Sequence, residues 1–186
     1  MLVLVGASGT GKSAIRNYLI SKYQMNKVIS CTTRTMREGE IDGQDYFFLQ
    51  KEEFEDRIQK KWFVEYTQYN DNYYGIPKHQ IKDNSIAIVE PDGVVSLKKQ
   101  EDIKLTIIYL QSLPTVRKER MRKRGDTDEQ ILQRIEIDNL RFETVKEYAD
   151  CMVDNDGNSI EDVAEYVFKL YNIENDLKKM KLEVEQ

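Results

Sequence analysis

The sequence predicts an α/β fold: a three-layer core around a mostly parallel five-stranded sheet, with an additional lobe inserted in it. Three observations lead to this prediction. A glycine-rich phosphate-binding motif follows directly after a short apolar segment at residues 2–5. Compact apolar segments at 85–89 and 105–110 alternate with stretches of helical periodicity, as is typical of parallel strands covered on both faces. Between about 34 and 80 short strands around a single helix interrupt this alternation, which indicates an added lobe.

The glycine-rich segment matches every fixed position of the P-loop pattern G-x-x-x-x-G-K-[ST]. Its residues are Gly6, Ala7, Ser8, Gly9, Thr10, Gly11, Lys12 and Ser13. The glycines allow backbone N–H groups to turn toward an anion, and the N-terminus of the helix that follows adds favourable partial charge. We therefore expect a nucleoside triphosphate here, with Lys12 reaching the outer phosphates and Ser13 beside a magnesium ion. A glycine-rich turn with a chance lysine is the alternative, and the flanking strand and helix disfavour it.

The 186 residues fit a single domain that is long enough to bury a core. The net charge of −5 disfavours a general nucleic-acid-binding surface, so an anionic ligand has to be met by local groups of Arg and Lys. Cys31 and Cys151 lack C-x-x-C spacing, which favours reduced thiols and a cytoplasmic location over a disulfide framework or a zinc site. Neither a membrane span nor a signal peptide is recognisable, so no membrane partner is expected.

Residues 27–33 are predicted to form the second strand, after which the polar segment 34–40 leaves the core. Within the lobe the pattern predicts strands at 45–49 and 63–69, a helix at 51–60 and a turn at 70–72. A small sheet with one helix, added to an alternating core, often holds a second substrate.

The second half of the chain returns to the alternating pattern. It predicts strands at 85–89, 105–110 and 151–153, and helices over about 90–99, from 114 and from 128. The helix from 128 carries Ile131, Ile135 and Leu140 at the spacing of an apolar face. A last helix begins at a pattern resembling a capping box, Ser159 to Asp162, and its polar end continues as an exposed helix or frays.

Further patterns follow the P-loop. Residues 30–37 read S-C-T-T-R-x-x-R, 63–75 contain F-V-E-Y and N-Y-Y-G, six of the eight residues 117–124 are basic, and 153–156 read V-D-N-D. Together with the P-loop they resemble the guanylate kinase family, in unbroken order over roughly residues 2–157. Several motifs in one order are far more specific than a P-loop alone.

This resemblance implies one domain, 1–186, whose parts have distinct roles. They are a core of about 1–33, 81–116 and 136–172, a GMP-binding lobe at about 34–80, a lid at about 117–135 and a polar tail at 173–186. The implied reaction is transfer of the γ-phosphoryl group of ATP to GMP, and to dGMP, giving ADP and GDP. Mg²⁺ would accompany ATP as cofactor, and the oligomeric state is left open.

For the acceptor, the resemblance implies GMP-binding roles for Ser30, Arg34, Arg37, Tyr46, Glu65, Tyr74 and Glu90. Two guanidinium groups and two phenols can surround a phosphate. Guanine presents adjacent N1–H and N2–H donors that one carboxylate can accept together, whereas adenine presents a lone pair at the first position and is rejected. The resemblance places Glu65 at this guanine-reading position, with Ser30 meeting O6.

For the transfer, the resemblance implies catalytic roles for Lys12, Arg34, Arg120, Arg124 and Arg134, and an ATP contact for Asn155 beside those of the P-loop residues. Because the γ-phosphoryl group passes in line between anions, positive charge and positioning supply the catalysis, and no general base is needed. The lid arginines would also exclude water. The competing interpretation of the basic run is a solvated helix face, and its spacing to Arg134 is one residue shorter than in the family.

Two departures from the family pattern bear on substrates. Ile88 stands where the family usually has an acid, which leaves Glu90 to serve either magnesium or the guanine pocket. Ile76 stands where a hydroxyl residue is common. A P-loop kinase for another phosphorylated small molecule and a non-catalytic protein-binding module therefore stay open as alternatives. The first predicts loss of the tyrosines and Glu65, the second an eroded P-loop, and the sequence shows neither.

Overall fold

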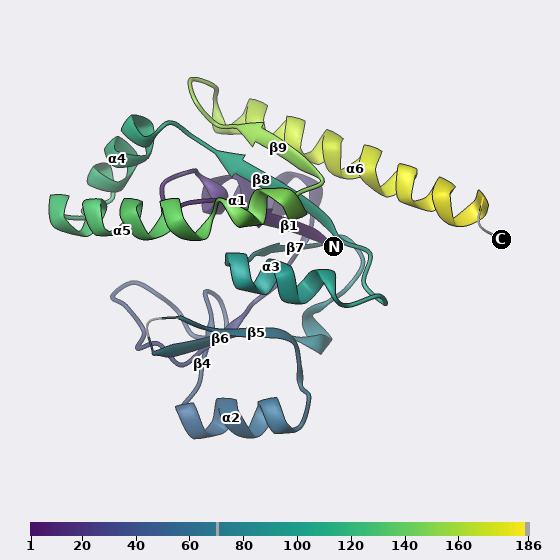
Figure 1. Ribbon diagram of the computed structural model, residues 1–186, viewed down its shortest axis with the longest axis horizontal. Coiled ribbons are helices and arrows are strands. Elements are labelled where there is room, and N and C mark those ends of the chain that lie inside the picture. The colour runs from purple at the N-terminus through teal and green to yellow at the C-terminus, as the bar shows by residue number, and fades with distance from the viewer. Residues whose placement is uncertain (70, 185–186) are drawn as a thin grey trace.

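The computed structural model describes residues 1–69 and 71–184 (Figure 1). In these residues five strands form the central sheet, in the order β2-β7-β1-β8-β9, and every pairing in it is parallel. The strands are β1 (Leu2–Val5), β2 (Asn26–Lys27), β7 (Ser85–Ile88), β8 (Thr106–Gln111) and β9 (Cys151–Asp154). The predicted α/β core with a mostly parallel five-stranded sheet is therefore confirmed.

Helices cover both faces of this sheet and make the core three-layered. The covering helices are α1 (Lys12–Tyr23) and α6 (Ile160–Val184) on one face and α3 (Pro91–Lys98) on the other, whereas α4 (Pro114–Lys123) and α5 (Asp128–Arg141) contact each other. Leu2 and Leu4 of β1 share a core cluster with α1 and α6, whereas Val3 and Val5 share one with α3. This division follows from the pleat, which sends successive side chains to opposite faces. All four side chains are fully buried, as expected for a central parallel strand.

The inserted lobe lies beside the core with its own sheet (Figure 1). In the described part of the chain this sheet has four strands, in the order β4-β3-β6-β5. The elements are β3 (Cys31–Thr32), β4 (Phe47–Phe48), α2 (Lys51–Gln59), β5 (Phe63–Tyr69) and β6 (Asn72–Pro77). Phe54 of α2 is fully buried and stacks on Phe63 and Tyr73, with ring centroids 4.3 and 5.2 Å away. The lobe thus has an aromatic core of its own.

The prediction of one strand at 27–33 is wrong, because the chain crosses from the core to the lobe within this segment. Lys27 pairs with Ile86 of the core sheet, whereas Cys31 pairs with Gly75 of the lobe sheet. The lobe sheet consequently begins at Cys31, before the predicted boundary at 34.

Strand β6 lies partly where the sequence pattern indicates only a turn, at 70–72. Asn72 already pairs with Tyr69 across the hairpin, and residue 70 lies outside the described residues. The aromatic pair Tyr73 and Tyr74, residues of high strand propensity, is the signal that could have revealed this strand.

The predicted lid at 117–135 covers parts of α4 and α5. Helix α5 begins at a complete capping box, in which Thr127 and Gln130 each accept a hydrogen bond from the other's backbone N–H. The helix continues to Arg141, past the predicted end of the lid. Leu140, predicted on an apolar face, is 78% exposed. That prediction is wrong because the inner face of α5 lines a polar cavity, described below, instead of packing on the sheet.

Helix α6 continues without a break through the predicted polar tail as far as Val184, and residues 185 and 186 lie outside the described residues. Its first turn is capped by Ser159, whose Oγ accepts a hydrogen bond from the backbone N–H of Asp162 at 3.0 Å. Farther along, Lys178 donates to the carbonyl of Leu105 at 2.7 Å and lies 3.1 Å from Asp150. Lys178 of the tail is therefore attached to the chain just before β8 and just before β9.

Two expectations from composition can be checked directly. Cys31 and Cys151 are free thiols, as predicted. Over residues 1–69 and 71–184, no helix has the length and apolar character needed to cross a membrane.

Phe54→Ala is expected to destabilise the lobe by about 3–5 kcal/mol, because it removes a fully buried ring and leaves a cavity. Amide hydrogen exchange should then rise more in β5 and β6 than in β1 and β8, since the lobe has a separate core. Glu52→Ala, at an exposed position of the same helix, is the matched control and should leave amide hydrogen exchange unchanged in both sheets. Equal loss of protection in both sheets would contradict a separate lobe core.

Candidate functional site

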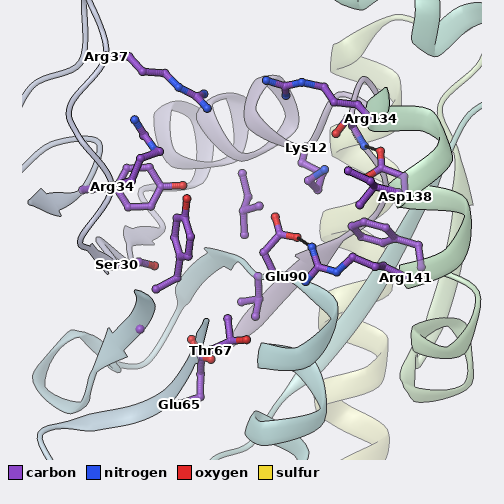
Figure 2. Close-up of a pocket in the computed structure, with 18 of the residues that line it drawn as sticks. Lys12, Ser30, Arg34, Arg37, Glu65, Thr67, Glu90, Arg134, Asp138 and Arg141 are labelled. Carbon is purple, nitrogen blue, oxygen red and sulfur yellow. Dashed lines mark hydrogen bonds and ion pairs between the residues drawn. The ribbon is translucent and has the colours of Figure 1, made fainter. Parts of the chain in front are cut away.

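A cavity of about 450 Å³ lies between the core, the lobe and α5. Figure 2 shows side chains from all three regions pointing into it. Most of the predicted site residues line this cavity: Ser8, Lys12, Ser30, Arg34, Arg37, Tyr46, Glu65, Tyr74, Glu90 and Arg134. The fold thus brings the P-loop and the predicted acceptor residues to one space, although they are far apart in the sequence.

The P-loop is held by side chains that bind its carbonyl groups. Lys12 donates hydrogen bonds to the carbonyl oxygens of Gly6 at 2.5 Å and Ala7 at 2.9 Å. Three more side chains each donate to one carbonyl oxygen: Arg117 to Ser8 at 2.8 Å, Arg120 to Gly9 at 3.3 Å and Asn155 to Thr10 at 2.7 Å. With its carbonyls bound in this way, the loop can present N–H groups to an anion. Gly11 has φ +91°, and a Cβ there would lie 2.3 Å from Asn155 Nδ2, so this position requires glycine.

Lys12 is folded back onto the loop in this structure. Burial lowers the pKa of its ammonium group to about 8, and the carboxylates of Glu90 and Asp138 oppose that shift. Its two carbonyl partners supply only partial negative charge. A phosphate near Lys12 would compensate the buried charge better than these carbonyls do.

The predicted lid arginines occupy three different environments. Arg120 lies behind the P-loop and donates to Asn155 O at 2.6 Å, and it does not line the cavity. Arg124 is paired with Asp126 at 2.6 Å and is largely exposed. Arg134 lines the cavity from α5. In this conformation, then, only Arg134 of these three faces the cavity.

At the lobe end of the cavity, basic and phenolic groups converge. The guanidinium of Arg34 lies 5.6 Å from the ring centroid of Tyr46, whose ring meets that of Tyr74 edge-on at 6.2 Å. Arg37 extends toward the same space in Figure 2. Arg34 is also paired with Glu40 at 2.7 Å. This end of the cavity is suited to a phosphate.

Glu65 of β5 is buried deep in the same cavity. Its Oε2 is buried and has no hydrogen-bond partner among the described residues. Burial raises the pKa of its carboxyl group to about 8, and a backbone hydrogen bond from Ile76 opposes the shift. A Cβ on Gly93 would lie 2.8 Å from Oε2, so glycine permits α3 to approach. A buried carboxylate oxygen without a partner is costly, which indicates that a ligand supplies the missing donor.

Helix α5 contributes residues that the sequence analysis missed. Asp138 and Arg141 line the cavity with Arg134, at the i, i+4, i+7 spacing of one helix face. Arg141 lies 3.4 Å from Glu90 and 3.0 Å from Asp92. The sequence signal for this face is the charged residues at positions 134, 138 and 141, which lie beside the apolar pattern of Ile131 and Ile135 on the same helix.

The structure also shows where Ile88 and Ile76, the two departures from the family pattern, are located. Ile88 ends β7 and lines the cavity next to Glu90, so an acid is indeed lacking at this point of the wall. Ile76 is 1% exposed and belongs to the core cluster that includes Val64. Ser13, the predicted magnesium-side residue, lies in the first turn of α1.

Comparison with known proteins agrees with this geometry. The family model described as guanylate kinase matches residues 1–170. The chain is 38% identical over 168 residues to the guanylate kinase of Aster yellows witches'-broom phytoplasma (strain AYWB), covering 84% of this chain and 78% of that protein. It is 35% identical over 188 residues to the guanylate kinase of Mycoplasmoides gallisepticum, covering 92% and 93%.

The fold agrees as well. The crystal structure of guanylate kinase from Anaplasma phagocytophilum superimposes with a TM-score of 0.73 at 23% identity, covering 94% of this chain and 85% of that one. At 23% sequence identity, this structural similarity is evidence for the fold alone. Because the family model spans nearly the whole chain, and relatives above 30% identity match most of it, the chain belongs to the guanylate kinase family.

Proposed function

We propose that this protein transfers the γ-phosphoryl group of ATP to GMP and dGMP, giving ADP together with GDP or dGDP. The observation that carries the proposal is that Lys12 of the P-loop and the buried carboxylate of Glu65 line one cavity. A P-loop alone is compatible with many proteins that bind triphosphates. A buried carboxylate that lacks a donor among the described residues adds a requirement for a ligand that donates hydrogen bonds.

The acceptor would lie across the lobe end of the cavity. Guanine can donate N1–H and N2–H together to Glu65, and Ser30 and Thr67 add hydroxyl groups to the same wall. The phosphate of GMP would then meet Arg34 and Arg37. Arg34 now pairs with Glu40, and that carboxylate compensates the guanidinium until a phosphate replaces it.

The donor would lie on the P-loop, with Lys12 turned from its carbonyl partners to the outer phosphates. Transfer then depends on positive charge along the path of the phosphoryl group, which Lys12, Arg34 and Arg134 line. Arg120 and Arg124 stand outside the cavity here, so we infer that α4 and α5 move when both nucleotides bind. Such closure would exclude water that could otherwise hydrolyse ATP.

Magnesium fits the donor end of the cavity by its donor chemistry. Ser13 in the first turn of α1 and Glu90 after β7 offer oxygen atoms, which Mg²⁺ prefers, whereas Ile88 offers none. Ser13 would bind the ion and Glu90 would hold water around it. When bound, the ion neutralises charge on the transferring phosphoryl group.

The proposal predicts that ADP forms from ATP with GMP or dGMP and far more slowly with AMP, CMP or UMP, as a coupled assay can measure. Glu65→Gln should lower kcat/KM for GMP by about 100-fold or more, because an amide cannot accept both guanine donors. Glu52→Gln, at an exposed position of α2, is the control with the same change of charge and should match the wild type. Equal rates with every monophosphate, or no turnover with any, would refute the proposal.

GMP binding is also expected to depend on pH. Burial raises the pKa of Glu65 to about 8, so near pH 7 the carboxyl group is mostly protonated and must lose its proton to accept both guanine donors. Binding should therefore release a proton, and affinity should rise by up to about tenfold per pH unit until about pH 8, where the carboxylate is already ionised.

Calorimetry of GMP binding at about pH 7, in buffers of different ionisation enthalpy, measures this proton directly. Glu65→Gln should bind GMP more weakly and release no proton from this site. If the variant releases as much as the wild type, the proton belongs to another group.

A further inference from the structure

Both backbone polar groups of Ser8 in the P-loop are held by side chains from the lid helices. The carboxylate of Asp138 on α5 accepts the Ser8 N–H at 2.7 Å, and Arg117 on α4 donates to the Ser8 carbonyl at 2.8 Å. Arg117 also donates to Asp138 at 2.8 Å. The three residues thus form a closed ring of hydrogen bonds. The two side chains are nearly buried, with 6% and 10% of their surfaces exposed.

One oxygen atom has the central place in this ring. Asp138 Oδ2 accepts both from a P-loop amide and from a guanidinium group. This pair of donors is typical of a protein site for a phosphate oxygen, because backbone amides at a P-loop and arginine side chains both favour anions. Oδ2 therefore occupies a position that suits an oxygen of the donor triphosphate.

The surroundings of Asp138 distinguish it from an ordinary ion pair between helices. Asp138 lines the nucleotide cavity together with Ser8 and Lys12, and Figure 2 shows it at the Lys12 end. A structural pair with Arg117 would not need to engage a P-loop amide as well. The carboxylate instead supplies negative charge beside the buried Arg117 and the partly buried Lys12.

We propose that Asp138 is an internal anion that occupies the Ser8 amide and the Arg117 guanidinium while the donor is absent, and that a phosphate oxygen of the donor displaces it. The proposal rests on the donor site assigned above. Because Asp138 belongs to α5, donor binding breaks the contact between this helix and the P-loop. Asp138 thus weakens donor binding and links it to movement of α5.

The test measures binding of inorganic tripolyphosphate and of ATP, each without GMP or magnesium, by calorimetry. Asp138→Asn should bind both about tenfold or more tightly than the wild type, because the neutral amide no longer competes as an anion and leaves the Arg117 charge available. Glu136→Gln, an exposed position of the same helix, makes the same change of charge away from the cavity and should leave both affinities unchanged. Unchanged or weaker binding by Asp138→Asn overturns the proposal.

Removal of one partner of a buried ion pair can prevent folding, so a second measurement uses the wild type. A crystal structure with a non-hydrolysable ATP analogue should show a phosphate oxygen within hydrogen-bond distance of Ser8 N and Asp138 moved away from it. Asp138 still bound to Ser8 N in that complex overturns the proposal.

The outcomes also separate this inference from the proposed function. If neither tripolyphosphate nor ATP binds the wild type, the donor site itself is refuted, and the inference with it. If both bind the wild type and Asp138→Asn with equal affinity, only the role of Asp138 is refuted.

Discussion

The site depends first on the hydrogen bonds that hold the carbonyl groups of the P-loop. Residues 6–10 receive these bonds from Lys12 and Thr10 within the motif, and from Arg117, Arg120 and Asn155 far along the chain. A loop this rich in glycine has little conformational preference of its own. Its ability to present amides to an anion therefore comes from α4 and from the end of β9, and a nucleotide site exists only when the whole core is assembled.

The charges around the cavity are compensated by other charged groups of the protein. Arg34 pairs with Glu40 at the lobe end, Arg117 with Asp138 at the P-loop, and Arg141 with Glu90 between them. Such pairs reduce the cost of burying these cations. Glu65 differs, because burial favours its neutral form. The cavity thus combines paired charges with a carboxyl group, that of Glu65, whose neutral form is favoured.

The parts of the fold and the site that could be predicted from the sequence are those with a local sequence pattern. The P-loop follows a fixed spacing, β1 and β8 are short apolar segments, and the acceptor residues follow from family motifs. Contacts between distant polar residues leave no such pattern: the Arg117 bond to Ser8 spans 109 positions and the Asp138 bond spans 130. The prediction of 27–33 as one strand failed for a related reason. An apolar and β-branched segment looks the same whether it pairs with one sheet or is shared between two.

The order of strands in the core sheet also constrains how the chain matures during synthesis. β1 is made first, yet its neighbours are β7 and β8, which end at residues 88 and 111. At a synthesis rate of about 5–20 residues per second, about 5–20 s pass between the synthesis of β1 and the synthesis of the second of these two neighbouring strands. Asn155, which holds the P-loop from the end of β9, is made later still. The apolar β1 therefore lacks its two sheet neighbours until residue 111 has been made, and during that time it can make the non-native contacts that lead to aggregation.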